Sequence, residues 1–310
     1  MSRQLSLFAP VGAAAQPKEV LKLSAGLADG LYLGTSSWSF PGWQGLVYDR
    51  KTSQTVLARH GLNAYARHPL FRSVSIDRTF YGPMRADELR DYRDAVPEDF
   101  RFVVKAHELL TRARTKDEPR SENPLFLDAA YANEEVIGPC IEGLGPKAGM
   151  LVFQFPPQRF DSVPAFVEQL GRFLQALPPK LDYAVELRNP EVLVPDYVSV
   201  LADTGATHCL NVHPTMPPVA EQRRSVADGS ATVLLRWMLR RNQTYGDAKE
   251  AFYPFDKIAE RDDASRDAIA DVCRGAKRAF VIVNNKAEGS APLSLQRLAE
   301  ALYSPPSVSA

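Results

Sequence analysis

The chain has 310 residues, 45% of them hydrophobic, and it carries 37 basic and 37 acidic side chains. This size and composition are enough to bury one large core, and the balanced charge excludes a global field that would attract nucleic acid or a membrane. No apolar run reaches the roughly 18 residues that a membrane-spanning helix needs. The three cysteines are far apart and form no Cys-x-x-Cys pair, which predicts a reducing, cytoplasmic setting without structural zinc or disulfides.

Residues 1–29 contain small and polar residues with little to pack, so we predict a flexible N-terminal arm. Within this arm, QLSLF closely resembles the pentapeptide by which bacterial DNA polymerases and repair proteins bind the replicative sliding clamp. A glutamine amide can bond to backbone while leucine and phenylalanine fill an apolar pocket. The alternative is a chance match in an unstructured or packed tail. The predicted clamp-binding residues are Gln4, Leu5, Ser6, Leu7 and Phe8.

Eight short apolar runs follow, bounded by Gly, Pro and polar residues. They read LYLGTSSW (31–38), SVSIDRTFY (73–81), FRFVVKA (100–106), GMLVFQFPP (149–157), YAVELR (183–188), HCLNVHP (208–214), VLLRWML (233–239) and AFVIVNN (279–285). Such runs suit strands buried on both faces, and the segments between them are long enough for helices. We therefore predict an α/β fold, a single-domain (β/α)8 TIM-type barrel over residues 30–303, with a disordered tail at 304–310.

Segments between the runs add two helices and a long loop. Residues 162–177 carry apolar side chains at helical spacing before two prolines, and residues 262–276 repeat the pattern less strongly. The charged stretch within residues 107–135 is longer than a simple connection requires. It is either a binding wall or lid, or a solvated loop.

Strand alternation predicts which side chains meet at the mouth of this barrel. In residues 183–188, Val185 and Leu187 suit the helix-facing layer, so Glu186 and Arg188 turn inward. The same parity places further polar side chains on the inner face: Ser75, Asp77, Thr79, Tyr81, Lys105, His107, Gln154, Asn211, His213, Arg236, and either Asn284 or Asn285. Active sites of such barrels lie at the carboxyl ends of the strands, where these residues accumulate.

Buried charges are costly unless they are paired, so a ring of this kind indicates a polar ligand. Lys105, Arg188 and Arg236 suit a phosphate or carboxylate, and the amides suit hydroxyl groups. Glu186 or Asp77 suits general acid or base chemistry, and we take these two carboxylates with Lys105 as the catalytic candidates. The alternative is an internal salt-bridge layer that only sets strand register.

Aromatic residues beyond the first two runs are a second candidate feature. Ser36 and Trp38 end the first run, and Trp38 and Tyr81 either stack on a sugar or base or pack beneath a loop. With the basic residues of the long loop they suit a groove for single-stranded or damaged nucleic acid.

The motifs GTSSWSFPGW, DRTFY, FRFVVKA, LVFQFPP, AVELR and VNNKAEGSAP resemble, in order, the YecE-like proteins, catalogued as domain of unknown function 72. The resemblance runs from about Leu31 to Leu302 and implies a TIM-type barrel of bacterial origin without an established reaction. The family pattern Glu-x-Asn before Thr-Phe-Tyr is replaced by Asp77 and Arg78. The histidine of its Arg-Leu-His-Gly pattern is absent after Arg236, and Ser294 stands where the family has Asn.

The candidate site residues suit few cofactors. His107, His213, Glu186 and Asp77 leave open a single Mg²⁺ or Mn²⁺, and the absence of a glycine-rich phosphate loop predicts no nucleotide cofactor. The preferred function is an enzyme, hydrolase or phosphodiesterase-like, that acts on a phosphate-containing substrate in DNA repair or processing and is tethered to the clamp. The alternatives are a sugar or sugar-phosphate hydrolase or isomerase with no DNA role, and a non-catalytic binding protein.

Overall fold

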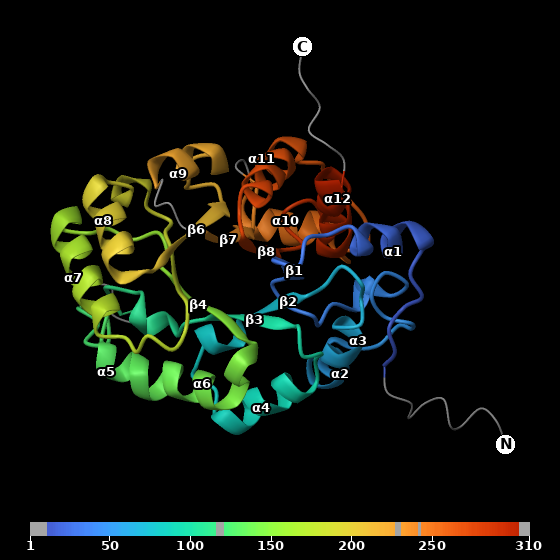
Figure 1. Cartoon of the computed structure of the whole chain (residues 1–310), viewed down its shortest axis with the longest axis horizontal. Coiled ribbons are helices and arrows are strands. Elements are labelled where there is room, and N and C mark those ends of the chain that lie inside the picture. Colours follow the sequence, from blue (N-terminus) through green and yellow to red (C-terminus); the bar gives the residue numbers. More distant parts are fainter. Residues whose placement is uncertain (1–10, 116–120, 227–230, 241–242, 304–310) are drawn as a thin grey trace, which may run out of the picture.

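Eight parallel strands form a closed barrel surrounded by helices (Figure 1). The computed structural model describes residues 11–115, 121–226, 231–240 and 243–303. The strands are β1 (Leu31–Thr35), β2 (Ser73–Ile76), β3 (Arg101–Lys105), β4 (Ala148–Gln154), β5 (Tyr183–Glu186), β6 (Thr207–Val212), β7 (Thr232–Trp237) and β8 (Arg278–Val283). Each strand pairs with the next in sequence, and β1 pairs with β8 from Leu31↔Ala279 to Thr35↔Val283. The predicted (β/α)8 barrel is confirmed.

Helical segments follow every strand and form the outer layer. They are α2 (Gln54–His60) and α3 (Leu62–Tyr65) after β1, α4 (Ala86–Asp94) after β2, α5 (Ala129–Tyr131) and α6 (Gly138–Leu144) after β3, α7 (Val163–Gln175) after β4, α8 (Pro195–Thr204) after β5, α9 (Val219–Ser225) after β6, α10 (Tyr245–Phe252) and α11 (Asp263–Arg274) after β7, and α12 (Ala291–Tyr303) after β8. The two helices expected from periodicity are α7 and α11. Ser162 and Asp262 cap them, because each side chain accepts a backbone N–H of the first turn.

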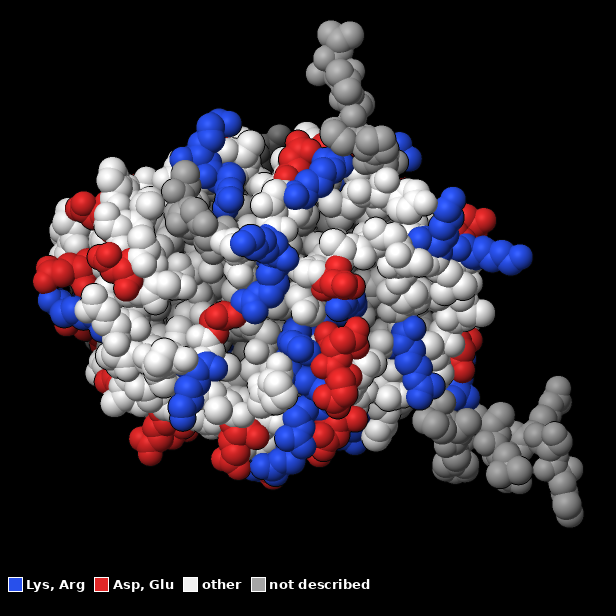
Figure 2. Space-filling model, viewed as in Figure 1, with Lys and Arg blue, Asp and Glu red and all other residues white. Residues whose placement is uncertain are grey.

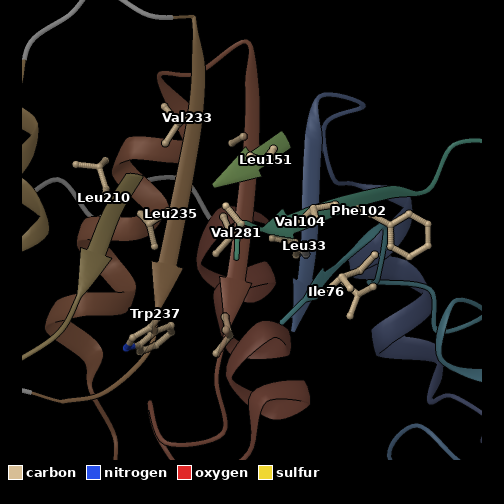
Figure 3. Packing of buried hydrophobic residues seen from close by; sticks show 14 of the residues in the cluster. Leu33, Ile76, Phe102, Val104, Leu151, Leu210, Val233, Leu235, Trp237 and Val281 are labelled. Atoms are coloured by element: carbon tan, nitrogen blue, oxygen red, sulfur yellow. The ribbon is translucent and has the colours of Figure 1, made fainter. Parts of the chain in front are cut away.

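Two hydrophobic layers hold the barrel together. The larger lies between the sheet and the helices, where Leu33, Val104, Leu235 and Val281 turn their side chains outward from the strands (Figure 3). The smaller fills the barrel interior and consists of Val103, Met150, Val152, Ala184, Cys209, Leu234, Phe280 and Ile282. This inner plug is apolar, and the candidate site residues lie at the carboxyl ends of the strands above it.

The predicted N-terminal arm differs from expectation in its described part. Helix α1 (Lys18–Ala25) packs against α12, as Figure 1 shows, and Val20 and Leu23 on this helix are buried. Two apolar side chains one turn apart did not indicate a helix in a segment of small and polar residues. In the structure, these two side chains pack α1 against the barrel domain. The QLSLF peptide at residues 4–8 and the tail at 304–310 lie outside the described residues.

The three cysteines and the lengths of the helices were both subjects of sequence-based expectations. Cys140, Cys209 and Cys273 are free and buried, and burial raises the pKa of the Cys140 and Cys273 thiols to about 12. None of the helices in the described ranges is both long and apolar enough to cross a membrane.

Candidate active site

Glu186 lies at the centre of a charged cluster at the carboxyl ends of the strands. Its side chain is fully buried, pairs with Arg188, and accepts a hydrogen bond from Arg236 Nη1 on Oε2 at 2.5 Å. Burial alone raises the pKa of the Glu186 carboxyl, but the two arginines outweigh burial and lower it to about 2. Glu186 is therefore ionised at neutral pH and orients two guanidinium groups.

Asp77 and Asn211 extend this cluster on either side. Arg236 Nη2 lies 3.4 Å from Asp77 Oδ2, and Ser75 Oγ donates to Asp77 Oδ1 at 2.6 Å. Arg188 Nη1 donates to Asn211 Oδ1 at 2.5 Å. The Asp77 side chain is 32% exposed whereas that of Glu186 is 0% exposed, so Asp77 is the carboxylate of the two that a ligand can reach.

Lys105 is a cation of the mouth that has no carboxylate partner among the described residues. Lys105 is 9% exposed, and its Nζ lies 3.4 Å from the centre of the Phe80 ring. In the described parts of the chain, no carboxylate lies within ion-pair distance of this Nζ. Burial lowers the pKa of the Lys105 ammonium to about 8, although nearby Asp77 partly offsets this effect. Lys105 thus combines a desolvated positive charge with a proton that leaves near neutral pH.

Thr79 fixes the relative position of two of these strand ends. Its Oγ1 lies 2.7 Å from the carbonyl oxygen of Ile76 and 2.6 Å from that of Lys105, which ties the end of β2 to the end of β3. The Thr79 hydroxyl therefore interacts with backbone carbonyl oxygens of the protein itself. We assign it to positioning Lys105 and Asp77.

Two histidines flank the cluster. His107 Nδ1 lies 2.7 Å from the Tyr131 hydroxyl, and His213 Nδ1 lies 2.9 Å from Thr215 Oγ1. Burial and the neighbouring Arg188 lower the pKa of His213 to about 4. His213 is therefore neutral at pH 7.

The amides expected at the mouth divide into two groups. Asn284 Nδ2 donates to Ser36 Oγ at 2.8 Å, which joins the ends of β8 and β1, and Gln154 lies opposite Glu186 in the β4–β5 register. Asn285 has a different environment, because its Oδ1 accepts from the Trp43 indole and from the Ala291 backbone N–H. Asn285 therefore fixes the loop that leads into α12.

Trp38 packs, as one of its two sequence-based alternatives predicted, whereas Tyr81 does not point inward as strand alternation suggested. Trp38 is 7% exposed, donates its indole N–H to the Leu57 carbonyl oxygen at 3.1 Å and packs edge-on against Tyr92, which suits packing rather than stacking on a substrate. Tyr81 is 76% exposed. Strand β2 ends at Ile76 and a 3-10 turn follows, so alternation no longer predicts side-chain direction at Thr79 or Tyr81.

Lys286 is a residue that strand patterning missed. It is 5% exposed, its Nζ lies 3.8 Å from the centre of the Tyr245 ring, and burial lowers the pKa of its ammonium to about 8. The signal was present, because this lysine directly follows the two asparagines at the end of β8.

The donor set favours an anion over a metal ion. Within the described residues, no group of three or more His, Cys, Asp or Glu side chains could hold a metal. Glu186, expected among the ligands, is instead engaged by two arginines. On the face seen in Figure 2, basic and acidic side chains are interspersed.

A closed parallel barrel with ionisable groups at its strand ends defines the class of (β/α)8-barrel proteins. Within this class, the chain belongs to the family described as "Protein of unknown function DUF72", whose model matches residues 32–308. It is 26% identical over 210 residues to the UPF0759 protein YunF of Bacillus subtilis (strain 168), covering 66% of this chain and 65% of YunF. The chain thus spans just under two thirds of that relative's length.

Solved structures of the same family share the fold. A DUF72 family protein of Thermotoga maritima MSB8 aligns with a TM-score of 0.60 at 21% identity, covering 88% of this chain and 99% of that one. A DUF72 family protein of Enterococcus faecalis V583 aligns with a TM-score of 0.58 at 20% identity, covering 89% and 96%. At these identities, the likeness shows a shared barrel fold.

Proposed function

We propose that this protein is an enzyme that acts on a phosphate-containing substrate, whose anionic group binds at the barrel mouth beside Lys105. The observation that carries the proposal is the buried ammonium of Lys105, which has no carboxylate partner among the described residues. A desolvated cation is costly unless a counter-charge is supplied. A bound anion supplies it.

The charges of the cluster support the same conclusion. Lys105, Arg188 and Arg236 contribute three positive charges, while Asp77 and Glu186 contribute two negative ones, which leaves one positive charge in excess. Guanidinium and ammonium groups are the usual protein partners of phosphate oxygens. Since Glu186 fixes both arginines before a ligand arrives, the mouth is preorganised for an anion.

The geometry suggests separate roles for the three catalytic candidates. Glu186 acts best as the counterion that orients Arg188 and Arg236, because both of its partners are arginines and its proton leaves at about pH 2. Asp77 is the accessible carboxylate and suits proton transfer to or from the substrate or water. Lys105, with a pKa of about 8, can hold the anion and donate a proton near neutral pH.

Inorganic sulfate tests the anion site, because its charge stays constant between pH 6 and 9. We expect Lys105→Met to weaken sulfate binding at least about tenfold at pH 7, since a charge-assisted contact contributes roughly 1.5–3 kcal/mol. In the unmodified protein, binding should weaken as the pH rises through about 8, where Lys105 loses its proton. In Lys105→Met this pH dependence should become weaker, because the Lys105 ammonium is absent. Isothermal titration calorimetry measures both effects.

Lys180→Met is the matched control, because Lys180 is exposed on the loop that precedes β5. It should bind sulfate as the unmodified protein does. Equal affinity in the Lys105→Met variant, or no sulfate binding to the unmodified protein, would contradict the anion site.

Sliding-clamp tethering is the second part of the proposal, and the QLSLF match supports it. If the peptide is functional, a protein with Leu7→Ala and Phe8→Ala together should lose retention on an immobilised bacterial clamp. A protein with Pro10→Ala and Val11→Ala should be retained, and a synthetic QLSLF peptide should release it.

Retention of the Leu7/Phe8 variant would remove the argument for DNA delivery. An intact anion site would then favour the sugar-phosphate alternative or a non-catalytic anion-binding protein.

A further inference from the structure

A cavity of about 610 Å³ lies beside the charged mouth and plays no part in the cluster described above. It is bounded on one side by residues 212–220, which connect β6 to α9, and on the other by residues that follow β7 and by the start of α11. Its volume is in the range of roughly 300–1,000 Å³ that is typical of small-molecule sites.

One wall of the cavity is apolar and firmly held. Met216, Pro217, Pro218 and Val219 line it. The side chain of Gln222 braces this wall, because its Nε2 donates to the carbonyl oxygens of Asn211 and Pro217, both at 2.7 Å. Consecutive prolines restrict the backbone further. The wall is therefore a preformed apolar surface onto which a flat group can pack.

The opposite wall is polar and offers a hydrogen-bond acceptor. Arg240 pairs with Glu260, and Gln243 Nε2 donates to Glu260 Oε2 at 3.2 Å. The other amide atom, Gln243 Oε1, is buried and has no hydrogen-bond partner among the described residues. A buried acceptor without a partner is costly, and a ligand N–H would satisfy it.

His213 forms the boundary between the cavity and the mouth. It directly follows the last residue of β6, interacts electrostatically with Arg188, and lines the cavity. Its Nδ1 accepts the backbone N–H of Thr215 at 3.3 Å, which places the proton of the neutral ring on Nε2. The ring therefore presents a neutral N–H donor at the junction of the two spaces.

We infer that this cavity binds the planar heterocyclic part of the substrate while the mouth binds its phosphate, so that the substrate is a nucleoside phosphate. This inference rests on the proposed function. A planar heterocycle fits because it combines an apolar face, for the proline-rich wall, with a polar edge, for Gln243 and the Arg240–Glu260 pair. A sugar alone would leave the apolar wall uncovered and needs hydroxyl partners on every side.

The test compares three probes by calorimetry: nucleoside 5′-monophosphates, ribose 5-phosphate and inorganic phosphate. In the unmodified protein, at least one nucleotide should bind tenfold or more tightly than either of the other two. Ala264→Trp, which fills the cavity from the exposed start of α11, should reduce nucleotide affinity to that of ribose 5-phosphate. Gln243→Leu should weaken nucleotide binding in the same direction. Neither variant should change the affinity for inorganic phosphate.

Ala58→Trp is the matched control, because Ala58 is exposed on α2 and does not line the cavity. It should bind all three probes normally. If ribose 5-phosphate binds as tightly as every nucleotide, or if Ala264→Trp and Gln243→Leu both bind nucleotides normally, the inference is wrong and the anion site remains. If no probe binds the unmodified protein, the proposed function fails as well.

Discussion

Replacement of Arg236 by methionine is expected to lower the free energy of unfolding by about 3–5 kcal/mol at pH 7. Glu186 is fully buried and its carboxylate is held by Arg236 and Arg188, so loss of one guanidinium leaves a buried charge only half compensated. Methionine retains much of the aliphatic volume of arginine, which limits the contribution of an empty cavity. Urea unfolding followed by circular dichroism gives the change in stability.

A matched control and a double variant separate the buried ion pair from a general cost of losing arginine. Arg172→Met breaks an exposed pair with Glu168 on α7, where we expect a loss below about 1 kcal/mol. The protein with both Arg236→Met and Glu186→Gln should lose less than the sum of the two single variants, because each partner is costly when left alone. Additive losses would show that the two residues are not energetically coupled.

Gly34→Ala should destabilise the protein by about 3 kcal/mol, the upper end of the usual cost of overpacking. A Cβ at this position would lie 2.1 Å from the Ser73 carbonyl oxygen, and that oxygen belongs to the backbone of the neighbouring strand. Gly34 and Ser73 are a register pair of β1 and β2, so the strands cannot separate here without disturbing the sheet. Because Ser36 and Asp77 follow these strands, sulfate binding should weaken too.

Gly82→Ala is the control for that substitution. Gly82 follows the turn after β2, and an added Cβ there would meet no atom within 4 Å. We expect its stability to change by less than about 0.5 kcal/mol. Thermal and urea unfolding of both variants provide the comparison. If the Gly34→Ala protein were as stable as Gly82→Ala, the backbones of β1 and β2 could move apart at this position at little energetic cost.

Local patterns were sufficient to predict the barrel. Each apolar run was read from a few neighbouring residues, and parallel strands of this length are stable only when helices cover their outer faces. The parity of residues 183–188 also placed Glu186 on the inner face, because alternation along a regular strand depends only on backbone geometry. Arg188 lies two residues beyond the end of β5 and still pairs with Glu186, as that parity predicted. Where the strand is regular, the sequence was enough.

Contacts between distant segments could not be predicted in the same way. Alternation does not say that Arg236 and Arg188 share one carboxylate, since that depends on side-chain rotamers at the ends of β5 and β7. Trp38 follows the regular part of β1, and its burial depends on the placement of α2 and α4. The side cavity arises from loops and helices after β6 and β7, which no local pattern describes.

Closure of the barrel between β1 and β8 has a consequence for biosynthesis. The two strands lie at opposite ends of the barrel sequence, yet they share five register pairs, and Asn284 joins Ser36 across the same seam. Until the last strand leaves the ribosome, β1 and β7 each present a bare edge that can pair with another chain. Nascent protein thus passes through a long interval with an open barrel, and a product truncated before residue 278 would never close it.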